Sequence, residues 1–171
     1  MNRKEIFLLI GQKGSGKSFV GKIIEKEFGI KFIRVESWIK NIKKGRDVYD
    51  EKYIKHSLEM IENGIRQEIN KTDKLVFEST GITKYFDRML ESLKEDFRVT
   101  TIGIHADSKI CLNRVKTRDK TIHINISDNQ VITINAKVRE KDFTSDFHID
   151  NGAKTNEDLI KELKDILTRY K

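Results

Sequence analysis

Apolar residues along the chain fall into short blocks whose spacing changes between the period of a strand and the period of a helix. The run from Glu5 to Ile10 is short and apolar and ends at a glycine-rich turn, which predicts a buried strand. A helix ended by Gly29 should follow, because the next apolar residues recur at helical spacing, at Val20, Ile23, Ile24 and Phe28. The chain therefore begins with a strand, a turn and an amphipathic helix.

The same succession of strand and helix continues to the end of the sequence. Further buried strands are predicted at Lys31–Glu36, Leu75–Phe77, Arg98–His105 and Phe147–Asp150. Helical segments between and after them are predicted at Ile54–Ile69, Phe86–Leu93, Ala106–Arg118 and Leu159–Tyr170. This alternation indicates an α/β fold of three layers, in which a five-stranded parallel sheet is flanked by helices and ligands bind at the carboxyl ends of the strands.

The pattern changes between Asp119 and Val138. Isoleucines alternate with polar residues on either side of the polar segment Ser127–Gln130, at positions 122, 124, 126, 132 and 134. Such alternation predicts a β-hairpin with a turn of about four residues. Because it interrupts the succession of strands and helices, we expect it to project from a single domain spanning residues 1–171, as an insertion at about 119–138.

Length and composition restrict the class of protein. At 171 residues, of which 37% are hydrophobic and 36% charged, the chain has the size of one domain. No apolar run reaches the length of a membrane span, and the N-terminal apolar run is too short for a secretory signal. The single cysteine, Cys111, excludes an internal disulfide, and no Cys/His cluster has metal-ligand spacing. We therefore expect a cytoplasmic protein without a membrane partner.

The net charge of +7 favours anionic partners, which include nucleotides, acidic metabolites and nucleic acids. Lysines and arginines are interleaved with acidic residues along the chain, so a solvated surface is favoured over a dedicated nucleic-acid face. The sequence leaves the oligomeric state open.

The turn after the first strand carries the most specific chemical signal. Residues Gly11–Ser18 read GQKGSGKS and fit the phosphate-binding pattern G-x-x-x-x-G-K-[ST], between a predicted strand and a predicted helix. Glycines let the backbone curl so that successive N–H groups point at phosphate oxygens, and the helix N-terminus adds its positive dipole end. Lys17 would bind the β- and γ-phosphates, and the Ser18 hydroxyl would ligate Mg²⁺. The sequence thus predicts a nucleoside triphosphate site, with cofactor-binding residues Gly11, Lys13, Gly14, Ser15, Gly16, Lys17 and Ser18.

Motifs beyond this loop resemble the small P-loop kinases, the superfamily of adenylate, shikimate and gluconate kinases, and the likeness covers nearly the whole chain. Gly14–Ser18, with Val20–Ile24 and Phe28–Gly29, resembles the opening of shikimate-type kinases. The pair Arg114 and Arg118 resembles the Arg-x-x-x-Arg element at the base of the mobile lid in these enzymes. The segments Arg139–Asp142 and Phe147–Gly152 are similar to the return from the lid and to the last strand with its base-contacting loop.

The resemblance implies roles for individual residues. Arg114 would stack on the purine, and Asn151 would belong to the loop that contacts the base. Arg118 would reach the phosphates, and Arg139 would return from the lid toward them, so both are expected to be catalytic. A lid also fits the chemistry, because phosphoryl transfer needs cationic stabilisation and the exclusion of water.

Two carboxylates are predicted at the carboxyl ends of strands. Glu36 occurs where shikimate-type kinases carry an acid that faces the acceptor, so it could take the proton of the acceptor hydroxyl. The sequence Glu36-Ser37-Trp38 departs from the D-x-D pattern of that family, and a capping role for Glu36 or Ser37 is an equal alternative. Glu78 closes the third strand, where P-loop proteins hold an acid near Mg²⁺, and its surroundings also resemble the acceptor-binding stretch of zeta-toxin kinases. Which of the two is the base stays open.

The leading hypothesis is an ATP- and Mg²⁺-dependent kinase acting on a small acceptor, with a nucleoside or nucleoside monophosphate favoured because of the long lid. A metabolite kinase of the shikimate, gluconate or zeta-toxin type is the first alternative. A nucleotide-dependent switch and a kinase of nucleic-acid ends are the others. Candidate anion binders on the acceptor side are Lys40, Arg46 and Arg66, each of which fits a surface charge better.

Overall fold

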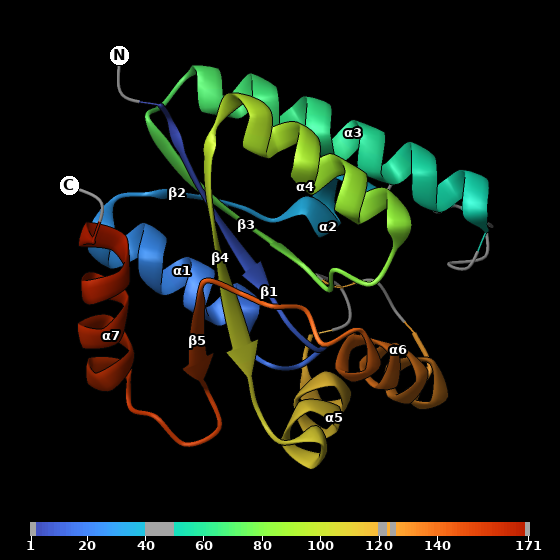
Figure 1. The fold of residues 1–171 in the computed structure, drawn as a ribbon. Coiled ribbons are helices and arrows are strands. Elements are labelled where there is room, and N and C mark those ends of the chain that lie inside the picture. The colour runs from blue at the N-terminus through green and yellow to red at the C-terminus, as the bar shows by residue number, and fades with distance from the viewer. Residues whose placement is uncertain (1–2, 40–49, 120–122, 124–125, 170–171) are drawn as a thin grey trace.

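Five parallel strands form the centre of the computed structural model, which describes residues 3–39, 50–119, 123 and 126–169 (Figure 1). The strands lie side by side in the order β2-β3-β1-β4-β5, so β1 occupies the middle of the sheet. Their bounds are β1 Glu5–Ile10, β2 Lys31–Ile33, β3 Lys74–Ser79, β4 Arg98–His105 and β5 Phe147–Asp150. The predicted α/β fold with a five-stranded parallel sheet is confirmed.

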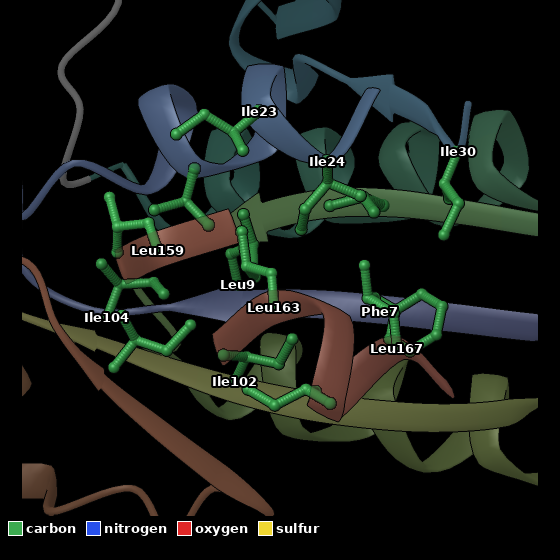
Figure 2. Close-up of a cluster of buried hydrophobic side chains, with 14 of the residues drawn as sticks. Phe7, Leu9, Ile23, Ile24, Ile30, Ile102, Ile104, Leu159, Leu163 and Leu167 are labelled. Carbon is green, nitrogen blue, oxygen red and sulfur yellow. The ribbon is translucent and has the colours of Figure 1, made fainter. Parts of the chain in front are cut away.

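Both faces of the sheet are covered by helices, and the alternation of side chains along β1 shows how (Figure 1). Phe7 and Leu9 point to the face covered by α1 (Lys17–Phe28) and α7 (Asn156–Thr168), where they join the cluster drawn in Figure 2. Ile6, Leu8 and Ile10 point to the face covered by α3 (Glu51–Asn70) and α4 (Lys84–Asp96). A strand buried on both faces has no polar side to show, which is why its sequence is an unbroken apolar run.

The position of β1 determines where a ligand can bind. The chain leaves β1 between β3 on one side and β4 on the other, and the crossover connections of these neighbours run in opposite directions. The loop after Ile10 therefore lies in the crevice at the carboxyl edge of the sheet. Helices α5 (Ser108–Thr117) and α6 (Asp128–Lys141) lie beyond the same edge (Figure 1).

The predicted hairpin between Asp119 and Val138 is wrong in its second arm, which is the helix α6. Its polar segment is a capping box rather than a turn, because the Ser127 side chain accepts from the Gln130 N–H and the Gln130 side chain accepts from the Ser127 N–H. Val131 and Ile134 are buried at helical spacing, whereas Ile132 is 52% exposed. The alternation of isoleucines two positions apart is thus a weaker indicator of structure in this segment than the helical spacing of Val131 and Ile134. Most of the first arm, at positions 120–122 and 124–125, lies outside the described residues.

The second strand is shorter than predicted, and this changes the setting of Glu36. Strand β2 ends at Ile33, and Val35–Ile39 form a short helix, α2, with Glu36 in its first turn. The ring of Trp38 packs on Gly64 of α3, where an added Cβ would lie 2.5 Å from the ring. Gly64 therefore allows α2 to approach α3 closely and fixes the short helix that carries Glu36.

Two further observations complete the architecture. Lys141 at the end of α6 donates to the Gly81 carbonyl and to Asp87, each at 2.6 Å, and so joins α6 to the loop between β3 and α4.

None of the helices in the described parts of the chain is both long and apolar enough to cross a membrane.

Gly64→Ala tests the packing of α2 on α3. Alanine in place of glycine inside a helix normally stabilises it by about 1 kcal/mol, but here the new methyl group meets the Trp38 ring, so we expect a net loss of about 1–3 kcal/mol in urea unfolding. In a Trp38→Leu background the same change should be neutral or stabilising, since the obstacle is gone. Equal losses in both backgrounds would show that the close contact between α2 and α3 does not exist.

Candidate functional site

The loop Gly11–Ser18 curls because glycines hold it against neighbouring backbone. Gly14 has a positive φ of 84°, and a Cβ there would lie 2.1 Å from the Cys111 carbonyl of α5. Gly16, with φ 97°, is the N-cap of α1, and a Cβ there would lie 1.9 Å from the Asn151 amide. The backbone N–H groups of the first turn of α1 are thus left at the carboxyl edge of the sheet, where they can bind an anion.

Asn135 of α6 holds the outer part of the loop. Its Oδ1 accepts from the Lys13 N–H at 2.7 Å, and its Nδ2 donates to the Lys13 carbonyl at 3.0 Å. The side chain is 4% exposed. Sequence reasoning missed Asn135, because the segment around it was interpreted as a hairpin; a polar residue at a buried helical position was the available signal.

Arg114 and Asn151 hold the inner part of the loop. The Asn151 amide donates to the Ser15 carbonyl at 2.9 Å, and the Arg114 guanidinium donates to the Asn151 carbonyl at 3.0 Å. A second, longer bond of 3.4 Å joins Arg114 to the Ser15 carbonyl. These two predicted cofactor-binding residues are therefore brought to the loop, where they fix its shape. The Ser15 hydroxyl beside them is buried without a hydrogen-bond partner.

Lys17 lies in the curl of the loop. Its ammonium group donates to the carbonyls of Gly11 and Gln12, at 3.0 and 2.8 Å. Burial lowers the pKa of Lys17 from 10.5 to about 8, and the neighbouring carboxylate of Glu78 acts in the opposite direction. A desolvated ammonium group whose hydrogen bonds go to carbonyl groups is suited to bind a polyphosphate, because the anion supplies a full negative charge close to it.

Ser18 and Glu78 form the oxygen pair that could hold a metal ion. The Ser18 Oγ lies 2.8 Å from both carboxylate oxygens of Glu78, whose side chain is 7% exposed. Alternation along β3 explains the contact, because Glu78 follows buried Phe77 and so points to the face of the sheet covered by α1. Hard oxygen donors, one of them a carboxylate, fit Mg²⁺, which keeps several waters and takes its remaining ligands from phosphates. No cluster of three or more His, Cys, Asp or Glu side chains suited to a metal occurs among the described residues.

Glu36 faces the same cleft from α2. Its Oε2 lies 3.0 Å from Nδ1 of His123, a residue that comes from the segment between α5 and α6. Arg118, the C-cap of α5, lies near both carboxylates. Burial lowers the pKa of Arg118, and Glu36 and Glu78 act against that effect. The structure thus brings the predicted residues Glu36, Glu78 and Arg118 together. It adds His123, whose position in the sequence shows no spacing that would indicate a partner.

Arg139 is the predicted catalytic residue that lies outside the cleft lined by the other predicted catalytic residues. Its guanidinium donates to the Ser108 hydroxyl at 2.9 Å, and it does not line the cleft. With the Gln12 amide oriented so that its nitrogen donates to Ala106, the Gln12 oxygen also accepts from Arg139 at 2.8 Å. A catalytic role for Arg139 stays a prediction, and these contacts favour a role in positioning Gln12.

One continuous cleft of about 510 Å³ connects these groups. The loop residues Lys17 and Ser18 line one part of it, and side chains of α2 and α3 line another. Glu36, Glu78 and Arg118 line the same cleft, and Arg118 lies near both carboxylates. Of the other predicted anion binders, Arg66 is paired with Glu62 and Asp96 on the surface, whereas Lys40 and Arg46 lie outside the described residues.

Comparison with known proteins places the fold. No family model and no curated protein matches the chain, whereas many solved structures do. Shikimate kinase from Acinetobacter baumannii, solved with shikimate, is 16% identical, with a TM-score of 0.65 over 99% of this chain and 95% of that one. A gluconokinase from Sinorhizobium meliloti is 19% identical, with a TM-score of 0.68 over 99% and 94%. The APS kinase of Mycobacterium tuberculosis, solved with AMPPNP and APS, is 14% identical, with a TM-score of 0.66 over 98% and 99%. The predicted fold of the small P-loop kinases is therefore confirmed.

The lowered pKa of Lys17 predicts how nucleotide binding depends on pH. Below pH 8 the ammonium group is charged before ATP arrives, whereas above it the group is largely neutral and must take up a proton when the phosphates bind. Affinity for Mg·ATP should therefore fall between pH 8 and 9.5. Titration calorimetry in buffers of different ionisation enthalpy should detect uptake of about half a proton at pH 8 and almost none at pH 6.5. The Lys17→Arg variant, which stays charged, is the control; equal uptake in that variant would assign the proton to another group.

Asn135→Ala tests whether α6 maintains the nucleotide loop. The change removes the two hydrogen bonds that Asn135 makes to the Lys13 N–H and carbonyl, so we expect a loss of about 1–3 kcal/mol in unfolding free energy and a several-fold weaker affinity for ATP. Asn113→Ala on the exposed face of α5 is the matched control and should change neither quantity. If the Asn135→Ala protein is less stable but binds ATP normally, α6 does not maintain the nucleotide-binding shape of the loop.

Proposed function

We propose that the chain is an ATP- and Mg²⁺-dependent kinase that transfers the γ-phosphoryl group of ATP to a hydroxyl group of a small acceptor. The observation that carries the proposal is the single cleft in which a P-loop lysine and the Ser18–Glu78 pair meet a second, carboxylate-bearing part. A site for nucleotide binding alone would not need that second part. Likeness to kinases of shikimate, gluconate and APS supports a small acceptor.

In the proposed reaction each residue has a distinct task. Lys17 and the N–H groups of the loop bind the β- and γ-phosphates, and Ser18 with Glu78 holds the metal. The Mg²⁺ ion would neutralise phosphate charge when bound. Arg118, which lines the same cleft, would stabilise the negative charge that develops on the equatorial oxygens.

Glu36 is the proposed base, because Glu78 together with Ser18 is assigned to the metal ion. The acceptor oxygen forms a bond to the γ-phosphorus, the bond from that phosphorus to the oxygen bridging to the β-phosphate breaks, and ADP leaves. The proton of the acceptor hydroxyl passes to the Glu36 carboxylate. The imidazole of His123, 3.0 Å from Glu36, holds that carboxylate in place.

A nucleoside or nucleoside monophosphate remains the favoured acceptor, and a sugar acid or other metabolite is the alternative. The cationic side chains Lys22, Arg34 and Arg118 line the cleft and suit either an anionic acceptor or the anionic product.

ADP formation tests the proposal. Protein, ATP and Mg²⁺ should release ADP quickly only with an acceptor from a panel of nucleosides, nucleoside monophosphates and hydroxylated metabolites. Lys17→Met and Glu78→Gln should each lower the acceptor-dependent rate by about 100-fold or more, because the first removes a cation that binds the γ-phosphate and the second weakens the proposed binding of Mg²⁺. Lys26→Met, which removes an exposed charge from the same helix, is the control and should keep full activity. Steady hydrolysis that no acceptor accelerates would instead identify an NTPase or a switch.

A further inference from the structure

The part of the cleft away from the P-loop is lined mainly by apolar side chains. They come from α2 and α3 and form one wall, made of Val35, Ile39, Tyr53, Ile54, Leu58 and Ile61. Phe19 of α1 also lines the cleft and is 46% exposed, which is unusual for a phenylalanine beside a polar loop. An exposed aromatic ring at a concave site indicates contact with an apolar ligand surface.

Two polar groups in this part of the cleft are buried without a partner. The Ser57 side chain of α3 is 5% exposed, and its Oγ has no hydrogen bond. The Nε of Arg34, at the end of β2, is likewise buried and without a hydrogen bond. Both residues line the cleft. A buried donor without a partner costs free energy, so the presence of two together indicates that a ligand group completes them.

The composition of this wall limits which acceptors fit. A polyol carries a hydroxyl group on nearly every carbon, and each one buried without a partner costs free energy. The wall is hydrocarbon apart from the Tyr53 hydroxyl, and Ser57 and Arg34 supply the donors beside it, so a polyol has more hydroxyl groups than this wall can satisfy. A flat ring with one or two oxygen acceptors matches the same wall, because its faces are apolar and its edge is polar.

We propose that this part of the cleft binds an acceptor with a flat, weakly polar ring, whose carbonyl or carboxylate oxygen accepts from Ser57 and Arg34. The hydroxyl group that receives the phosphoryl group then belongs to an arm of the molecule that extends toward Glu36. This inference rests on the proposed kinase function and narrows its acceptor: a nucleoside or a hydroxyalkyl aromatic acid fits, and a sugar acid does not.

Binding of chosen probes tests the ring requirement directly. Four compounds separate the features: thymidine with ring carbonyls, 4-(hydroxymethyl)benzoate with a ring carboxylate, benzyl alcohol with a ring but no acceptor oxygen, and gluconate as a polyol. Titration by NMR of the protein saturated with Mg·ADP should show binding of thymidine or the benzoate at least about ten-fold tighter than of benzyl alcohol or gluconate, which corresponds to one good hydrogen bond. Thymidine alone binding would identify the oxygen as a carbonyl, and the benzoate alone a carboxylate.

Ser57→Ala tests the proposed hydrogen bond between Ser57 and the ligand. Two quantities are measured together, the melting temperature and the affinity for the ring probe, because a serine that only supports the fold would lower the first and leave the second unchanged. Because the variant loses a hydroxyl that has no partner, its melting temperature without ligand should be equal to or higher than that of the unmodified protein. Its affinity for the ring probe should fall about five- to ten-fold. Ser92→Ala is the matched control: the Ser92 hydroxyl bonds Arg66 and Glu62 away from the cleft, so that variant should melt lower and bind normally.

The outcomes separate this inference from the kinase proposal. If gluconate binds and is phosphorylated as well as the ring probes, or if Ser57→Ala melts lower and binds normally, the flat-ring acceptor is wrong while the kinase function stands. If neither Mg·ADP nor Mg·ATP binds to the unmodified protein in a separate NMR titration, the kinase function fails, and the assignment of its acceptor fails with it.

Discussion

The close approach of the Gly11–Ser18 backbone to its neighbours is the constraint on which the rest of the site depends. Gly14 touches the backbone of α5, and Gly16 touches the amide of Asn151, so neither position has room for a side chain. This contact fixes the start of α1, and with it the positions of Lys17 and Ser18. It also fixes the distance from Ser18 to Glu78 across the edge of the sheet. A loop that could relax outward would separate the phosphate-binding and metal-binding groups.

Features governed by local sequence were predictable. The phosphate loop depends on residue types within one short segment, and the strands are buried on both faces, so an apolar run identifies them without further context. The sheet and the positions of Lys17, Ser18 and Glu78 followed from these signals. Arg114 and Asn151 were expected near the nucleotide, and the structure places them on the loop, although they contact its carbonyls.

Features governed by contacts between distant segments were not predictable. Ser127–Gln130 satisfies both a turn pattern and a capping box, and only the burial of Val131 and Ile134 by the rest of the protein decides for the helix. The pair of Glu36 and His123 joins residues 87 positions apart, which no spacing rule connects. Nothing in the sequence distinguishes Ser57 from other helical serines, because the lack of a hydrogen-bond partner for its hydroxyl is a property of the folded cleft.

The two attachments of α6 have a consequence for how this protein can vary. Asn135 joins the helix by hydrogen bonds to the loop after β1, and Lys141 joins it to the loop after β3. The helix therefore holds the segment that precedes Lys17 and the segment that follows Glu78 in fixed positions relative to each other. Substitutions at either attachment would shift both loops together. Asn135 and Lys141 should therefore show epistasis with each other across two turns of helix, while solvent-facing positions such as Ile132 are free to drift during evolution.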